Sequence, residues 1–287
     1  MILTKELAKK VRDTVDAGLV KGKGNPIPGQ MCVEAAVNYA MGLPHGDNPS
    51  CVGSAVRNFK IVLNDAQGWT SNAARAKGLR RVAIAQLGSD KLDQVEFSKA
   101  LALETIRQIL PIALRNVGVH HPRLATEFDA LASGCEAATN LVDAKNAART
   151  SAFAAHAACP AAYAAIAAAY DVAYAAAYTA RAHANPDKIL TLAAEIAVQI
   201  LIKMGCQGCE WLDLVPLDKN EGDNMKHKHA EILQAIAEDK DDELAESDFW
   251  DNDKEDNQLL KLGVCYLTEA AAREHAEALI KVSGGVL

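Results

Sequence analysis

Residues 30–63 read QMCVEAAVNYAMGLPHGDNPSCVGSAVRNFKIVL, which is the pattern of two helices joined by a turn. Apolar residues recur at spacings of three and four in the first part and predict a helix over residues 30–41. Gly42 fits the position just past its end, because glycine readily takes the left-handed conformation found there. Asn48 is a good N-cap and Pro49 suits a first helical position, so a second helix is predicted to begin at this point. The stretch therefore predicts a helical hairpin.

The same signals extend the helical prediction in both directions. An apolar residue recurs near every fourth position over residues 2–19, which predicts a first helix. Ser71 can cap a helix that reaches Leu87. Asp93, followed by Glu96 three positions later, resembles the capping box that starts a further helix. Helices are therefore expected on both sides of the hairpin.

Proline and glycine mark the ends of the later helices. Pro111 is expected to bend the helix that carries it. Residues 144–184 hold 22 alanines, and Pro160 divides this segment into two helices that can pack closely. An apolar helix is predicted over residues 187–204, with Gly205 as its stop.

The fold class follows from this order of elements. The sequence has no alternating apolar and polar pattern of strand length, so we expect an all-α fold, a multi-helix bundle of about ten helices with alanine-rich central helices. Two regions are predicted: a helical core domain over residues 1–216, and a C-terminal helical segment over residues 217–287. The second region contains an acidic insertion at residues 238–256.

Charge and hydropathy exclude some classes of function. The formal net charge is −7 and the isoelectric point is near 5.6, which argues against a protein that coats DNA or RNA in general. The sequence shows no signal segment at its start and no apolar run of about 18 residues, so we expect a cytoplasmic protein that does not enter a membrane. The seven cysteines follow no regular spacing and are expected to be reduced and mostly buried.

The hairpin also carries residue types that serve acid–base chemistry. Glu34, His45 and Asp47 are candidate catalytic residues, because carboxylates and imidazoles transfer protons near neutral pH. In the alternative interpretation, Asp47 and Asn48 hydrogen-bond the turn and the start of the next helix, and His45 packs against them. The sequence leaves open whether this turn is functional or structural, and with it whether the protein is an enzyme.

The run MCVEAAVNYAMGLPHGDNPSCV at residues 31–52, with Leu-Asn-Asp at 63–65 and Leu-Gly-Ser at 87–89, resembles a family of helical proteins of bacteria and their phages. Its members share a Glu-containing helix, a turn of His, Asp and Pro, and a later Asn-Asp pair, and no activity is known for the family. Members often read Ser-Asp-His-Pro at the turn, whereas His45 stands before the aspartate here. The resemblance covers residues 30–90 and implies a shared helical module.

Tyrosines recur along the alanine-rich segment at spacings that gather them on one side of a helix. Such a stripe can stack on a planar base, and a nearby arginine could meet a phosphate. The candidate ligand-binding residues are therefore Tyr163, Tyr170, Tyr174, Tyr178 and Arg181. In the alternative interpretation, the stripe packs against a neighbouring helix and its hydroxyls find buried acceptors.

Cys206 and Cys209 have the C-x-x-C spacing of redox and zinc motifs. The pair follows a predicted helix, whereas a thioredoxin-type cysteine begins one, where the helix dipole lowers the thiol pKa. A zinc site needs two further ligands, and the downstream His227 and His229 stand at no known spacing. No metal or cofactor is predicted, and Cys51, Cys206 and Cys209 come nearest to a set of metal ligands.

Three functions are compatible with these patterns. The first is a non-catalytic helical protein of a phage or mobile element that binds a protein partner or associates with itself, because the common nucleotide, hydrolase and metalloprotease motifs do not occur. The second is an enzyme or binding protein for a small nucleotide-like ligand, with the Glu/His/Asp centre and the tyrosine stripe as its pocket. The third takes residues 238–256, eleven of which are acidic, as a mimic of nucleic acid that inhibits a nucleic-acid-binding host protein.

Overall fold

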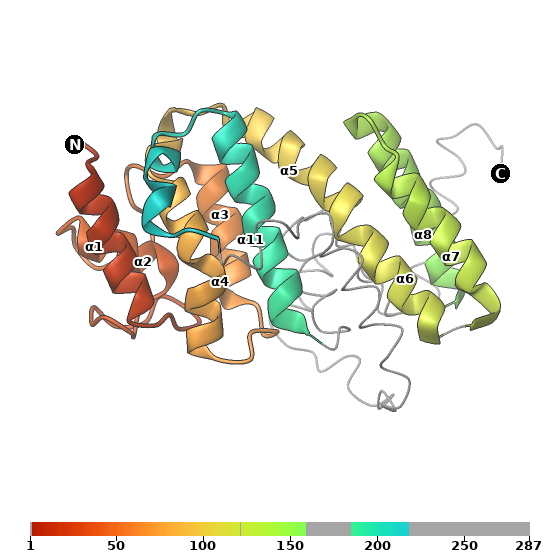
Figure 1. Cartoon of the computed structure of the whole chain (residues 1–287), viewed down its shortest axis with the longest axis horizontal. Helices are drawn as coiled ribbons and strands as arrows, with labels where there is room; N and C mark the ends of the chain where they lie inside the picture. Colours follow the sequence, from red (N-terminus) through yellow and green to blue (C-terminus); the bar gives the residue numbers. More distant parts are fainter. Residues whose placement is uncertain (1, 121, 159–184, 218–287) are drawn as a thin grey trace, which may run out of the picture. The chain divides into compact units, whose positions relative to one another are not determined.

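A computed structural model of the chain describes residues 2–120, 122–158 and 185–217 (Figure 1). In these ranges the regular secondary structure is helical, which confirms the all-α prediction. The α-helices are α1 (Lys5–Asp16), α2 (Val33–Ala40), α3 (Ser54–Asp65), α4 (Asn72–Ala85), α5 (Gln94–Gln108), α6 (Leu110–His120), α7 (Ala125–Glu136), α8 (Leu141–Ala158) and α11 (Pro186–Lys203). The 3-10 helices are η1 (Ser89–Lys91), η2 (Pro122–Leu124) and η4 (Gln207–Leu214).

Two of the predicted helix starts are confirmed by their capping bonds. The Ser71 hydroxyl accepts a hydrogen bond from the backbone N–H of Ala74 at 3.0 Å, and α4 begins directly after it. One carboxylate oxygen of Asp93 accepts from the N–H groups of Val95 and Glu96 at 2.8 and 3.1 Å. Each cap satisfies backbone donors that have no partner within their own helix.

The predicted start of α3 is wrong. The helix begins at Ser54, and neither Asn48 nor Pro49 belongs to it. The Asn48 side chain accepts a hydrogen bond from the Arg57 guanidinium and so does not cap the helix. Gly53 is the N-cap instead, and its own N–H donates to the Ser89 hydroxyl at 3.0 Å. A contact with a residue far along the chain therefore outweighed the local Asn-Pro signal.

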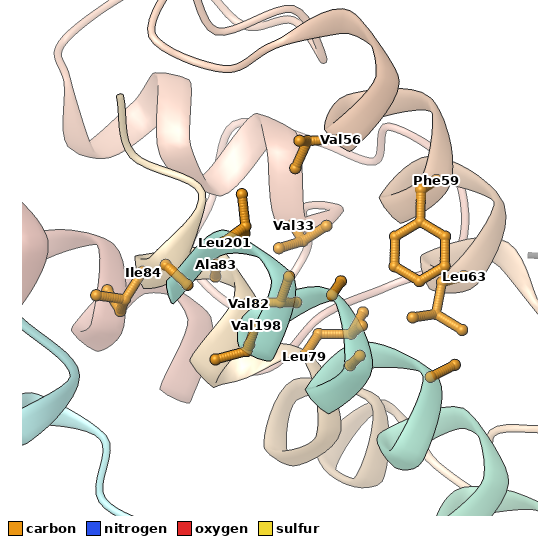
Figure 2. Close-up of a cluster of buried hydrophobic side chains, with 14 of the residues drawn as sticks. Val33, Val56, Phe59, Leu63, Leu79, Val82, Ala83, Ile84, Val198 and Leu201 are labelled. Atoms are coloured by element: carbon orange, nitrogen blue, oxygen red, sulfur yellow. The ribbon is translucent and has the colours of Figure 1, made fainter. Parts of the chain in front are cut away.

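The main apolar core lies where α2, α3, α4 and α11 meet (Figure 2). Leu79 and Val82 of α4 face the middle of this cluster and are fully buried, and each such side chain contributes about 1.5–3 kcal/mol on burial. Gly78 on the same helix allows Trp69 to pack closely, since a Cβ there would collide with the indole ring. Helix α4 is therefore buried over much of its surface, and α1, α2, α11 and η4 pack against it.

A second apolar cluster is formed by the ends of α5 and α6 with α7 and α8. Phe128 of α7 is its largest fully buried side chain, and it packs with Ile106 of α5 and Leu114 of α6. Arg115 ties α6 to α7 on the outside through Asp129, with N–O distance 2.8 Å. Helix α5 reaches both clusters, because its Phe97 belongs to the first and Ile106 to the second.

The helix break expected at Pro111 is present. Helix α5 ends at Gln108, and α6 begins at Leu110 with the proline in its first turn. The predicted stop at Gly205 is also present, since this residue follows α11 with a φ of 72°. All described residues belong to the first of two compact units, residues 1–240 and 241–287. The predicted boundary at 216–217 and the acidic insertion lie at or beyond the end of the described residues and stay predictions.

Candidate functional site

A fully buried ion pair joins α2 to α3. The Nζ atom of Lys60 lies 2.8 Å from Oε1 of Glu34, and both side chains have no exposed surface. Glu34 stands in the first turn of α2 and Lys60 in the middle of α3. An unpaired charge at this depth would be strongly unfavourable, so each residue depends on the other.

Further polar groups surround the pair. Gln86, the fully buried C-cap residue of α4, lies close enough to Glu34 to lower the pKa of its carboxyl group. Burial is the main cause that raises the pKa of Glu34, and the charge of Lys60 partly offsets it. Burial likewise lowers the pKa of Lys60, against the effect of Glu34. Both pKa values are thus shifted towards the neutral forms of the two groups, and three helices converge on one buried polar cluster.

Glu34 is among the candidate residues predicted from the sequence, and Lys60 is not. A signal was present, because Val56, Phe59 and Leu63 predict one apolar stripe on α3 and Lys60 stands within that stripe. Lysine is almost never fully buried without a partner, so a lysine in this position indicates a buried carboxylate. Because no surface of the pair is exposed, a substrate cannot touch it in this conformation.

The other candidate catalytic residues have different environments. The Nε2 atom of His45 lies 2.9 Å from the carbonyl oxygen of Gly24, and the Asp47 side chain is exposed. Among the described residues, no hydrogen bond joins Glu34, His45 and Asp47 to one another. The structure therefore does not bring the three together, and a catalytic role for them stays a prediction.

The Asn-Asp pair at the end of α3 holds the loop that precedes α2. The Asn64 side chain accepts from the N–H of Val33 at 3.2 Å and donates to the carbonyl of Val20 at 2.9 Å. Asp65 accepts from the N–H of Gly22 at 2.8 Å. These bonds satisfy backbone groups of the loop and of the start of α2, which is a structural role.

Cys206 and Cys209 follow α11, as expected, and they also lie at the start of a further helix, η4, which was not expected. Cys206 is the N-cap of η4, and its thiol donates to the carbonyl of Leu87 with an S–O distance of 3.4 Å. The Cys209 sulfur lies 3.8 Å from the carbonyl oxygen of Ala85. The sequence could not show this, because only Gly205 and Cys206 separate the C-cap of α11, Met204, from the first residue of η4, Gln207.

The structure describes the remaining metal-ligand candidate, Cys51, but not the candidate ligand-binding residues. Cys51 is buried, with its sulfur 3.7 Å from that of Met41. Within residues 2–120, 122–158 and 185–217, no group of three or more His, Cys, Asp or Glu side chains is placed to hold a metal ion. The proposed ligand-binding residues lie outside the described residues: Tyr163, Tyr170, Tyr174, Tyr178 and Arg181.

A groove of about 720 Å³ runs between α3, α5 and α8. Its apolar lining includes Phe59, Phe97 and Leu101, and the exposed Val95 lies at its edge. Its polar lining consists of hydroxyl, amide and lysine side chains: Ser54, Asn58, Gln94, Ser98, Lys99 and Lys145. The described residues that line it include no aspartate, glutamate, histidine or cysteine.

Comparison of the chain with protein-family models, with curated proteins and with solved structures finds no match. None of the described helices combines the length and apolar character needed to cross a membrane.

Proposed function

We propose that this is a non-catalytic helical binding protein that takes an apolar segment of a protein partner into the groove between α3, α5 and α8. The observation that carries the proposal is the composition of the groove. Large apolar side chains line it, and its described lining has none of the acid, base or thiol groups that most enzymes use. The charged pair that could transfer a proton, Glu34 and Lys60, is sealed in the core.

The shape of the groove favours an amphipathic helix as the bound element. Grooves between helices commonly receive the apolar face of another helix, with anchors at spacings of three and four residues. The volume of about 720 Å³ lies within the range of specific binding pockets. Lys145 lines the groove and adds positive charge, which favours a partner helix with acidic residues beside its apolar face.

The source of this partner is inferred from the resemblance of residues 30–90 to helical proteins of bacteria and their phages. On that basis we place the partner among the proteins of a phage or of its bacterial host. The proposal also allows a second copy of the chain as the partner. Binding of a nucleotide-like ligand depends on tyrosines outside the described residues and stays a prediction.

A site-specific photo-crosslinker tests the proposal. It is placed at Ala102, which lines the groove, and in a control chain at Ile202, which is exposed on α11 and away from the groove. Both chains are irradiated in the cells that naturally produce the protein. We expect a discrete protein adduct from position 102 and none from position 202.

The mass of the adduct separates a foreign partner from a second 30.6 kDa copy of the chain. Val95→Asp introduces a charge at the edge of the groove and should abolish the adduct, whereas Ile202→Asp should leave it unchanged. Equal labelling from the two crosslinker positions, or no adduct from position 102, would overturn the proposal.

A further inference from the structure

The loop Cys206–Cys209 closes the C-terminal end of α4. The last carbonyl groups of a helix have no partner within it and need donors from elsewhere. Just past the end of α4, the N–H of Gly208 donates to the carbonyl of Leu87 at 2.7 Å, and the Cys206 thiol donates to the same oxygen at 3.4 Å. The loop is thereby held against α4, and both sulfurs face its backbone.

Gly208 makes this close approach achievable. A Cβ at this position would collide with the carbonyl oxygen of Ile84 and would lie 2.9 Å from that of Ala85. The loop that Gly208 allows places both sulfurs against carbonyl groups at the end of α4, and the N–H of Cys209 donates to the carbonyl of Cys206 at 3.0 Å. A C-x-x-C turn whose two sulfurs face the same end of one helix is arranged for an S–S bond, whose length is about 2.05 Å.

The two thiols differ in access and in acidity. Cys209 is half-buried and can be reached from solvent, whereas Cys206 is 2% exposed. The interaction with Cys209 lowers the pKa of Cys206, and the interaction with Cys206 raises the pKa of Cys209. Cys206 is therefore the more easily ionised thiol of the pair, whereas Cys209 is the one that a small disulfide can reach.

We propose that Cys206 and Cys209 form a redox-active dithiol that is oxidised by low-molecular-weight disulfides. The accessible Cys209 thiol first gives its proton to water, and its thiolate then attacks the small disulfide, forms a mixed disulfide and releases one small thiolate, which takes up a proton. The Cys206 sulfur then attacks the Cys209 sulfur, and the second small thiol leaves with the proton of Cys206. The protein loses two electrons and two protons, and one small disulfide becomes two thiols.

Oxidation also changes the end of α4. A disulfide has no S–H group, so the Cys206 thiol no longer donates to the carbonyl of Leu87 and the Cys209 thiol no longer faces that of Ala85 as a donor. The dithiol thereby links the redox state of the surroundings to the hydrogen bonds at the end of α4. This inference does not depend on the groove or on its partner.

Oxidised glutathione is a suitable probe for the full-length protein. The native chain is incubated at graded ratios of oxidised to reduced glutathione, acid-quenched, alkylated and digested with trypsin. Residues 204–219 form one tryptic peptide that contains both cysteines, because no lysine or arginine stands between Lys203 and Lys219. We expect this peptide to lose two hydrogen masses and both alkylation sites as the ratio rises, while the helical circular dichroism persists.

Two single variants test the order of attack. Cys206→Ser should accumulate a glutathione adduct on Cys209, because the resolving thiol is absent. Cys209→Ser should react slowly, since Cys206 is buried. Cys135→Ser, which removes a buried thiol from α7, is the matched control and should form the 204–219 disulfide as wild type does.

Failure of the native pair to oxidise in a large excess of oxidised glutathione would overturn the proposal. The same chain in denaturant shows that the disulfide peptide is detectable. Formation of the disulfide only in denaturant, or a stable adduct on Cys209 of the wild type, would equally refute it.

Discussion

The Lys60 ammonium lies 2.8 Å from the Glu34 carboxylate with no exposed surface on either side chain. The pair fixes the register between α2 and α3, because a shift of either helix would separate the two charges within the core. Breaking a buried pair is costly, whereas replacing both members by apolar groups of similar volume often is not. The pair therefore serves to select one register between α2 and α3 rather than to add stability.

Removing one member of the pair should be far more harmful than removing both. We expect Lys60→Met to lower the free energy of unfolding by about 3–5 kcal/mol, because Glu34 is left buried without its cation. The double variant Lys60→Met with Glu34→Leu should regain most or all of this loss. Urea unfolding followed by circular dichroism measures both, and a single variant as stable as wild type would contradict this account of the pair.

The pair also makes a prediction about pH. Burial raises the pKa of Glu34 above its ordinary value of 4.5, so the folded chain binds this proton more tightly than the unfolded chain. The resulting stability is fully present below pH 4.5 and is lost as the pH rises through the folded pKa. Wild type should therefore lose stability relative to Glu34→Gln over this range.

Denaturant unfolding at a series of pH values tests this difference. Glu127→Gln, at an exposed position of α7, controls for the loss of one negative charge. A difference between wild type and Glu34→Gln that is constant, or that grows in favour of wild type as the pH rises from 4.5, would show that the Glu34 pKa is not raised.

Replacement by alanine should change stability in opposite directions at two glycines. Gly208→Ala should lower stability by about 1–3 kcal/mol, because its Cβ would collide with the backbone at the end of α4. Gly134 lies in α7 with nothing within 4 Å of an added Cβ, so Gly134→Ala should raise stability by about 0.5–1 kcal/mol. Thermal unfolding of the two variants compares them directly, and equal effects would argue against the tight loop contact.

The hairpin turn gives a fourth prediction. His45→Ala should lower the free energy of unfolding by about 0.5–1.5 kcal/mol, because its ring nitrogen is hydrogen-bonded to the carbonyl of Gly24. Asp47→Ala should change it by no more than about 0.5 kcal/mol, since this side chain is exposed. Chemical denaturation of both variants gives the order, and a larger effect at Asp47 would contradict a structural role for His45.

Helices with local signals could be predicted from the sequence. The caps at Ser71 and Asp93 act on neighbours within three residues, so the pattern alone locates the starts of α4 and α5. The start of α3 could not be predicted in this way, because Gly53 is held by Ser89, which is 36 residues away. Local chemistry determines a helix end only where no distant contact competes with it.

The candidate site likewise depends on contacts between residues that are far apart in the sequence. Glu34 is a candidate from the sequence because of its residue type, yet its partner is Lys60, on the apolar stripe of another helix. The thiols of Cys206 and Cys209 meet carbonyls that precede them by more than a hundred residues. Only tertiary structure brings these groups together, so a search for neighbouring motif residues does not find them.

The Cys206–Cys209 loop has a consequence for the order of synthesis. The Cys206–Leu87 and Cys209–Ala85 contacts span 119 and 124 positions along the chain. Because a ribosome makes the N-terminal residues first, α4 leaves it long before the loop that closes its last turn exists. During this interval the carbonyl groups of Ala85 and Leu87 lack the donors that the loop supplies, and these contacts form only after residue 209 has emerged.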